Sequence, residues 1–286
     1  MPEVIFLGNE PPYLDVIDQH ANLKALVSEK MRSRKARACF GSAHSWAKQR
    51  GRRIISPVDF YEKPEKADLY IVSGFSRLIP LRISGVPSIG TINIHQSFLP
   101  AYKGRHPLNW VLINGEKETG TTIHHVNEKF DDGKIIVRQK VKVAPEDTVL
   151  DVHWNTVRAG KKLLKKVFQI IGTKEFEGFT QDLSLASYNR PRTPRDGRID
   201  WNQPDETIRN LVRSLVDPYP GAYFYYHGKK IIVDDGAVYR EAIDLPMRKG
   251  VPFTQNGKWY VQTGNGLFEI LNIRNKAGFE VFGRTH

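Results

Sequence analysis

The amino-acid sequence predicts an α/β protein whose mostly parallel sheet is covered by helices and followed by a small C-terminal antiparallel β-barrel. Three observations lead to this fold class. Apolar strand-like runs alternate with helical stretches in residues 1–172, a segment rich in Gly, Pro, Arg and Asn follows, and the remainder holds short β-prone runs separated by Gly-containing turns. We therefore expect a first domain at 1–172, a connector at 173–198 and a second domain at 199–286.

The first domain begins with short apolar runs that are expected to form buried parallel strands. They occupy residues 4–7, 23–27, 53–55, 69–72 and 91–94, and a helix is predicted at 42–49. Ligands of open parallel sheets bind at the carboxyl ends of the strands, here at Gly8, Gly74 and residues 93–95. Because no Gly-x-Gly-x-x-Gly pattern follows the first strand, a nicotinamide cofactor is not expected.

Two further runs, at 123–126 and 135–143, are expected to pair at the edge of the sheet and to place Asp131 in the loop between them. An amphipathic pattern at 148–171 predicts a long helix, because its apolar residues recur at helical spacing. The lysines of that helix are expected on its solvated face. They are Lys161, Lys162, Lys165 and Lys166.

The connector contains Pro191 and Pro194, and two prolines so close together predict an absence of regular structure there. A helix is predicted around residues 206–216. The strands of the second domain are predicted at 222–226, 230–233, 258–262 and 267–273.

The composition limits the functional class. The chain has 286 residues, one cysteine (Cys39) and a formal net charge of +12. A single cysteine favours a reducing compartment and argues against a disulfide scaffold or a cysteine-ligated metal. No apolar run approaches the ~20 residues of a membrane helix, and residues 1–8 do not resemble a signal peptide. We expect a cytoplasmic protein that binds no metal and no membrane. Its positive charge favours a polyanionic ligand: tRNA, a nucleotide diphosphate or a polyglutamylated folate.

Asn93, His95 and Asp131 have the chemistry to attack a one-carbon acyl group with an amine. The attack needs a base, and His titrates near working pH. The amide NH2 of Asn93 can stabilise the developing oxyanion by ~3 kcal/mol. Asp131 would orient His95, directly or through a water, and stabilise the imidazolium. A structural role stays open, since Asn-x-His at a strand end and Asp-Asp-Gly in a turn are common without catalysis.

The pattern Asn-x-His-x-Ser-x-x-Pro at 93–100, with an Asp-x-Gly loop seven residues beyond His124, resembles the formyltransferases that use 10-formyltetrahydrofolate. The resemblance covers nearly the whole chain. It implies a Rossmann-like formyltransferase fold with an OB-like C-terminal domain, and a catalytic triad of Asn93, His95 and Asp131. Gln96 departs from the family pattern, where Pro is common. The resemblance also implies that the segment at 73–80 holds the pterin ring. The cofactor-binding residues implied are Gly74, Phe75, Arg77, Leu78, Ile79, Asp132 and Gly133.

The family resemblance leaves two classes of amine acceptor. Residues 39–43 and 46–51 are similar to the enzymes that formylate nucleotide-linked amino sugars, whereas methionyl-tRNA formyltransferases carry a longer basic loop there. We expect a nucleotide sugar rather than nucleic acid. Methionyl-tRNA is the alternative, and a folate-binding or nucleic-acid-binding protein without turnover is the third hypothesis. Self-association is compatible with the same sequence. The substrate-binding residues expected are Lys103, Arg105, Tyr188, Asn189 and Arg190.

Overall fold

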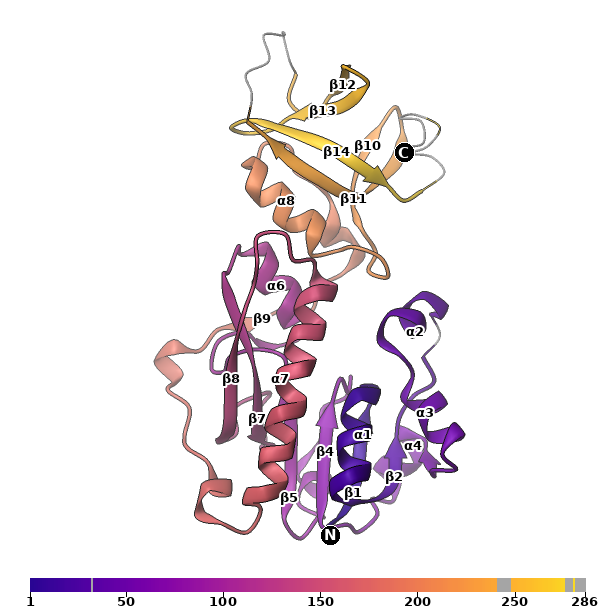
Figure 1. The fold of residues 1–286 in the computed structure, drawn as a ribbon, viewed down its shortest axis with the longest axis vertical. Helices are drawn as coiled ribbons and strands as arrows, with labels where there is room; N and C mark the ends of the chain where they lie inside the picture. The colour runs from indigo at the N-terminus through magenta and orange to yellow at the C-terminus, as the bar shows by residue number, and fades with distance from the viewer. Residues whose placement is uncertain (32, 241–247, 276–279, 281–286) are drawn as a thin grey trace. The chain divides into compact units, whose positions relative to one another are not determined.

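The longer strands lie in two sheets, one in each of two units (Figure 1). The computed structural model describes residues 1–31, 33–240, 248–275 and 280. The first unit comprises Met1–Pro107, Glu118–Lys142 and His153–Arg190. The second comprises Leu108–Lys117, Val143–Val152 and the described residues of Pro191–His286. The change from one unit to the other after Arg190 falls inside the connector expected at 173–198.

The first unit is built on a seven-stranded sheet with the order β3-β2-β1-β4-β5-β7-β8. The first five strands in the chain pair in parallel, whereas β7 and β8 are antiparallel to their neighbours. The predicted mostly parallel sheet is confirmed. The edge pair is longer than predicted, because β7 begins with buried threonines that carry no apolar signal. The strands are β1 (Glu3–Gly8), β2 (Asn22–Val27), β3 (Ile54–Ile55), β4 (Leu69–Ser73), β5 (Gly90–His95), β7 (Glu118–His125) and β8 (Ile135–Lys142).

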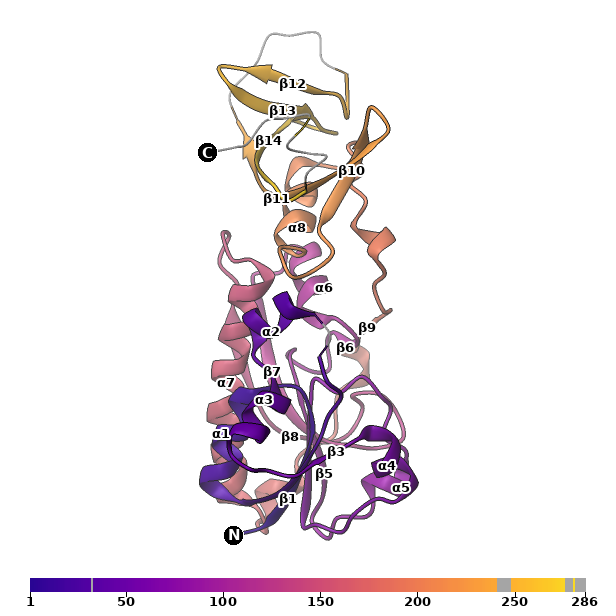
Figure 2. The same ribbon diagram turned by 90° about the vertical axis from the view of Figure 1, so that its right-hand side faces the viewer.

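Helices cover both faces of this sheet (Figure 2). Successive strand residues point to opposite faces, so Val4 and Phe6 of β1 pack in the core with α1, α3 and α7, whereas Ile5 and Leu7 pack with α4 and α5. The helices predicted at 42–49 and 148–171 are confirmed. No helix in the described ranges is long and apolar enough to cross a membrane. The helices of the first unit are α1 (Pro11–His20), α2 (Arg34–Phe40), α3 (Ala43–Gln49), α4 (Pro57–Glu62), α5 (Leu81–Ser84) and most of α7 (Val149–Ile170). The helix α6 (Pro107–Ile113) belongs to the second unit from Leu108 onward.

The second unit contains a five-stranded antiparallel sheet, in the order β10-β11-β14-β13-β12, and the helix α8 (Asp205–Arg213). Trp201 and Ile208 pack with the inward residues of this sheet. The expected antiparallel C-terminal domain is confirmed. β11 continues past its predicted end at Val233, because bulges beside Asp235 absorb the polar residues without ending the ladder. β12 was not predicted. The strands are β10 (Ala222–Tyr226), β11 (Lys229–Tyr239), β12 (Pro252–Gln255), β13 (Lys258–Gln262) and β14 (Leu267–Ile273).

The connector has more regular structure than predicted. It contains the short 3₁₀ helices η1 (Lys174–Glu177), η2 (Leu183–Leu185) and η3 (Pro194–Gly197), and β9 (Tyr188–Asn189), which pairs with β6 (Lys103–Gly104). The prediction that its prolines exclude regular structure was wrong. Pro194 stands in the first turn of η3, where the missing N–H costs nothing, and Thr193 and Asp196 form a capping box there.

Candidate active site

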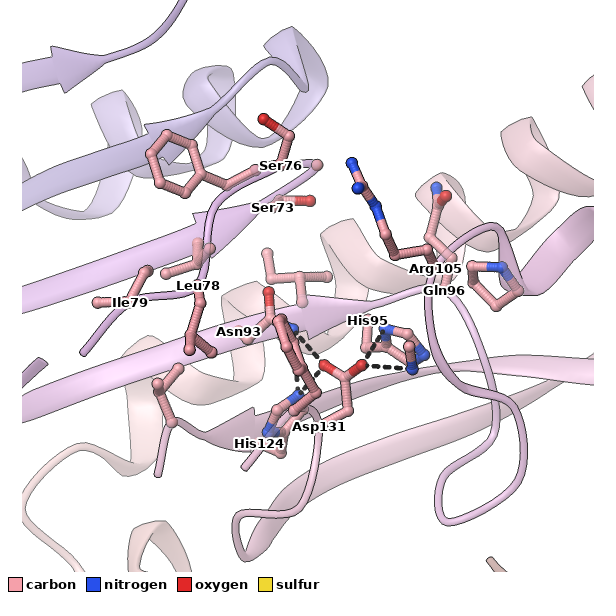
Figure 3. Close-up of a pocket in the computed structure, with 18 of the residues that line it drawn as sticks. Ser73, Ser76, Leu78, Ile79, Asn93, His95, Gln96, Arg105, His124 and Asp131 are labelled. Atoms are coloured by element: carbon pink, nitrogen blue, oxygen red, sulfur yellow. Dashed lines mark hydrogen bonds and ion pairs between the residues drawn. The ribbon is translucent and has the colours of Figure 1, made fainter. Parts of the chain in front are cut away.

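A pocket of about 380 Å³ opens at the carboxyl ends of β4 and β5 in the first unit (Figure 3). Three segments line it: the residues that follow β4, the last residues of β5 with the turn before α6, and the loop between β7 and β8. This is the position in which open α/β sheets bind their ligands. The fold therefore places the predicted catalytic residues and most of the predicted cofactor-binding residues around a cavity.

Asn93, His95 and Asp131 lie together on one wall of this pocket (Figure 3). Asn93 and His95 are two residues apart on β5, so their side chains leave the same face. Asp131 lies in the loop between β7 and β8 and has a φ of 53°, a left-handed conformation that Asp adopts more readily than most residues. Asn93 Nδ2 donates to Asp131 Oδ1 over 3.1 Å, and Asp131 Oδ2 lies 3.6 Å from His95 Nδ1.

The carboxylate of Asp131 is held in its ionised form. Burial alone would raise its pKa, but the neighbouring His95 and His124 side chains and a hydrogen bond from the Gly104 N–H outweigh burial and keep the pKa well below its ordinary value. The Gly104 N–H donates to Oδ2 over 2.8 Å. Asp131 is thus a fixed negative charge beside the His95 ring.

The hydrogen bonds of His95 identify its basic nitrogen. Nε2 lies 2.9 Å from the carbonyl oxygen of Tyr102, and because a carbonyl only accepts, Nε2 carries the proton. The neutral ring therefore has its lone pair on Nδ1, the atom that faces Asp131. A proton taken from an amine would arrive on Nδ1, where the carboxylate stabilises the imidazolium. The Tyr102 carbonyl, which the sequence did not point to, sets the orientation that was expected from Asp131.

His124 is a further residue of this site that the sequence analysis did not assign. It stands opposite Asn93 in the register between β5 and β7. Its Nδ1 donates to the His125 carbonyl over 2.8 Å, so Nε2 accepts from Asn93 Nδ2 at 3.1 Å. The amide of Asn93 is thereby clamped between His124 and Asp131. Because both partners use its NH2 group, donation to a substrate oxygen requires one of these bonds to be exchanged.

The segment after β4 forms the opposite wall of the pocket. Gly74, with a φ of 60°, starts it. Phe75, Leu78 and Ile79 supply apolar surface, and Arg77 pairs with Glu29 at 2.6 Å. They are the residues that the family resemblance implies hold the pterin ring.

Two of the residues expected at the cofactor, Asp132 and Gly133, lie outside the pocket lining. A Cβ on Gly133 would lie 1.8 Å from the His125 carbonyl oxygen, so only glycine fits this close approach. Asp132 accepts a charge-assisted hydrogen bond from Lys103, which lowers the pKa of Asp132. Both residues shape the loop that carries Asp131.

The residues expected to bind the acceptor fall into two groups. Arg105 is exposed and lines the pocket. Lys103 is fully buried, paired with Asp132, and its ammonium lies 5.3 Å from the ring centre of Tyr188. A phosphate could reach Lys103 only if this ion pair opened. Asn189 and Arg190 follow Tyr188 at the end of the first unit, and neither lines the pocket.

Comparison with known families follows the same division of the chain. The profile described as "Formyl transferase" matches residues 15–168, which is more than half of the chain. The profile described as "Formyl transferase, C-terminal domain" matches residues 192–282. The chain belongs to the formyl transferase family.

Individual relatives of this formyl transferase agree with that assignment. It is 35% identical over 189 residues to the bifunctional polymyxin resistance protein ArnA of Wigglesworthia glossinidia brevipalpis, covering 66% of this chain and 29% of that protein. The chain therefore spans under a third of that relative. Its fold matches an N-formyltransferase from Helicobacter canadensis in complex with folinic acid and dTDP-3-aminofucose, with a TM-score of 0.73 and 19% identity over 94% of this chain and 99% of the other. It also matches the structure of WlaRD, a sugar 3N-formyl transferase, in the presence of dTDP and 5-N-formyl-THF. The TM-score is 0.73 and the identity 18%, over 96% of this chain and 99% of the other.

Replacement of Asn93 by alanine is expected to lower kcat of this formyl transferase by about a hundredfold, the effect of losing one oxyanion donor. KM for the formyl donor should change much less, because the segment after β4 is untouched. Steady-state kinetics of the N93A variant test this. A kcat near that of the wild type would remove Asn93 from the chemical step.

Proposed function

We propose that this formyl transferase moves the formyl group of 10-formyltetrahydrofolate to the amine of a nucleotide-linked amino sugar. The observation that carries the proposal is the joint placement of Asn93, His95 and Asp131 in one pocket with the segment from Gly74 to Ile79. The first group has the chemistry of acyl transfer to an amine. The segment from Gly74 to Ile79 has apolar side chains and a strand-end backbone that can bind a flat ring such as a pterin.

A reduced folate is the formyl donor that fits this pocket. Its pterin ring would lie against Phe75, Leu78 and Ile79, whose apolar surface faces the cavity. Aromatic and aliphatic walls with a few polar groups are usual for sites that bind ligands of this size. Two relatives with the same fold were crystallised with formylated folates, which supports the choice of donor.

The proposed reaction uses each polar side chain once. The acceptor nitrogen attacks the formyl carbon, and the carbonyl oxygen becomes an oxyanion that takes a hydrogen bond from Asn93 Nδ2 in exchange for the bond to His124. His95 Nδ1 removes a proton from the attacking nitrogen, and Asp131 stabilises the resulting imidazolium. The oxyanion then collapses, the bond between the formyl carbon and the folate nitrogen breaks, and the proton held by His95 passes to that nitrogen to give tetrahydrofolate.

The choice of a nucleotide sugar as acceptor predicts a shallow salt dependence. A sugar nucleotide presents two phosphates to the protein, whereas a tRNA contacts many, and log affinity for nucleic acid falls by ~0.7 to 0.9 per unit of log salt for each phosphate neutralised. Reversing the charges of Lys161, Lys162, Lys165 and Lys166 should accordingly leave KM for the acceptor unchanged. Kinetics of this variant over a range of potassium chloride concentrations test the prediction. A large rise in KM would favour tRNA.

An acceptor panel tests the proposal itself. dTDP-3-aminofucose, UDP-linked 4-amino-4-deoxyarabinose and charged initiator methionyl-tRNA would each be incubated with 10-formyltetrahydrofolate, and release of tetrahydrofolate would be followed. We expect release with a nucleotide sugar and none with the tRNA. Formylated methionyl-tRNA as the product would establish the alternative, and folate binding without release with any acceptor would support a binding protein.

A further inference from the structure

Behind the pocket wall lies a polar cluster that the proposed reaction does not use. Glu10 stands just before α1, Gln96 directly follows His95, and His153 lies on α7. Gln96 Nε2 lies 3.1 Å from His153 Nδ1, and His153 Nε2 lies 3.8 Å from Glu10 Oε2. Glu10 fits because residue 74 is glycine, since a Cβ there would lie 3.2 Å from Glu10 Cγ and Oε1. Gly74 and Gln96 both line the pocket, so the cluster borders it directly. Gln96 is labelled among the lining residues in Figure 3.

The surroundings of His153 define where its proton lies. Burial lowers the pKa of His153 to about 4, so the ring is neutral at neutral pH. The Gln96 side chain presents its NH2 group to Nδ1, and an amide N–H only donates, so Nδ1 accepts and the ring proton is on Nε2. Nε2 points toward Glu10, whose pKa burial raises to about 7, and makes no hydrogen bond with the residues that the structure describes. Phe40 and Trp154 pack edge-on against the imidazole, with ring centroids 4.8 and 5.1 Å away, and hold it in place.

In this arrangement the bond to His153 involves only the NH2 group of Gln96 and not its side-chain carbonyl oxygen. It accepts no hydrogen bond from the residues that the structure describes, and it is not among the buried polar atoms. The residue lines the same pocket as His95. An amide oxygen only accepts hydrogen bonds, so this position favours an N–H or O–H group and disfavours a carbonyl or ether oxygen.

We propose that Gln96 Oε1 accepts a hydrogen bond from the acceptor substrate, from its amine or from a hydroxyl beside that amine, and that His153 is the positioning residue that keeps this oxygen turned toward the pocket. The inference rests on the proposed function and adds a specificity determinant to it. It also gives a role to the residue that departs from the family pattern, since a proline at position 96 would have no side-chain hydrogen bond to offer.

Gln96→Met tests the first half of the inference, because methionine keeps the length of the side chain and removes both amide groups. One neutral hydrogen bond is worth about 1 kcal/mol, so KM for dTDP-3-aminofucose or UDP-linked 4-amino-4-deoxyarabinose, whichever the wild type formylates, should rise about five- to tenfold. KM for 10-formyltetrahydrofolate should stay the same. Gln139→Met, on the exposed side of β8, is the matched control and should behave as the wild type.

Two substitutions of His153 test the second half without altering Gln96. Asparagine places a side-chain oxygen near the position of Nδ1 and can accept from the Gln96 amide, whereas glutamine places its amide nearer the position of Nε2. H153N should keep the acceptor KM of the wild type, and H153Q should raise it as Q96M does. Thermal unfolding and calorimetric binding of 5-formyltetrahydrofolate would verify that each variant is folded.

The outcomes separate this inference from the proposed function. An unchanged acceptor KM in Q96M, or equal effects of H153N and H153Q, would overturn the role of Gln96 while leaving the proposed function standing. Loss of kcat alone in Q96M would also overturn it, since a specificity contact acts on acceptor binding. If the wild type formylates neither sugar nucleotide, the proposed function fails, and this inference fails with it.

Discussion

Replacing His95 with asparagine is expected to lower kcat by roughly 10²- to 10⁴-fold, the usual contribution of a general base. The ring is held by the Tyr102 carbonyl at Nε2 and presents Nδ1 to Asp131. Asparagine is too weak a base to take a proton from the attacking amine. Folate affinity should hardly change, because the residues of the opposite pocket wall are intact. Single-turnover kinetics and calorimetry with 5-formyltetrahydrofolate separate the two effects.

His20→Asn is the matched control for this variant, because His20 is exposed at the far end of α1. It should keep the kcat of the wild type. A His95→Asn variant that turned over at a comparable rate would show that the amine loses its proton to another group or to water.

Replacing Asp131 with asparagine is the second change with a large expected effect. Asparagine preserves the size of the side chain and tolerates the left-handed backbone, but it removes the charge that stabilises the imidazolium. We expect kcat to fall by about a hundredfold or more, on the scale of one lost electrostatic contact in an active site. Asp59→Asn, on the exposed surface of α4, is the control and should leave kcat unchanged.

The Asp131→Asn substitution is also expected to change the stability of the fold. The pKa of Asp131 is lower in the folded protein than its ordinary value of 3.8. The ionised carboxylate therefore stabilises the fold above that value, and this contribution is lost as the pH falls through the folded pKa. The free energy of unfolding of D131N should be lower than that of the wild type at neutral pH, and the difference should shrink below pH 3.8. Urea unfolding over this pH range measures it, and a difference that grew in acid would contradict the electrostatic assignment.

The sequence was sufficient to predict the features that depend on local pattern. The continuous apolar runs of β1 and β4 predicted buried parallel strands, and the helical spacing in 148–171 predicted α7. The alternation of side chains on a strand predicted that Asn93 and His95 share a face. The family resemblance, through the spacing from His124 to Asp131, implied the loop that reaches them.

Features that depend on strand register or on tertiary contacts were not predictable in this way. His124 reaches Asn93 because the register of β5 and β7 sets them opposite, and the strand pattern alone does not fix that register. The Tyr102 carbonyl is a backbone group without a sequence signal. Lys103 was expected to bind the substrate, whereas it is buried against Asp132, a partner 29 residues away. Proline disfavours helix at most positions, but Pro194 lies in the permissive first turn of η3.

The most direct test of the central claim follows the formyl group itself. 10-Formyltetrahydrofolate with an isotopically labelled formyl carbon would be incubated with the wild-type protein and with whichever aminated sugar nucleotide the acceptor panel identifies, and the label would be traced by nuclear magnetic resonance. We expect the label to appear as a formamide on the sugar, in equal amount to the tetrahydrofolate released, and to stay on the folate in the His95→Asn variant. Label recovered as free formate, or tetrahydrofolate released without any formylated sugar, would contradict the proposal that the chain is an N-formyltransferase of nucleotide sugars.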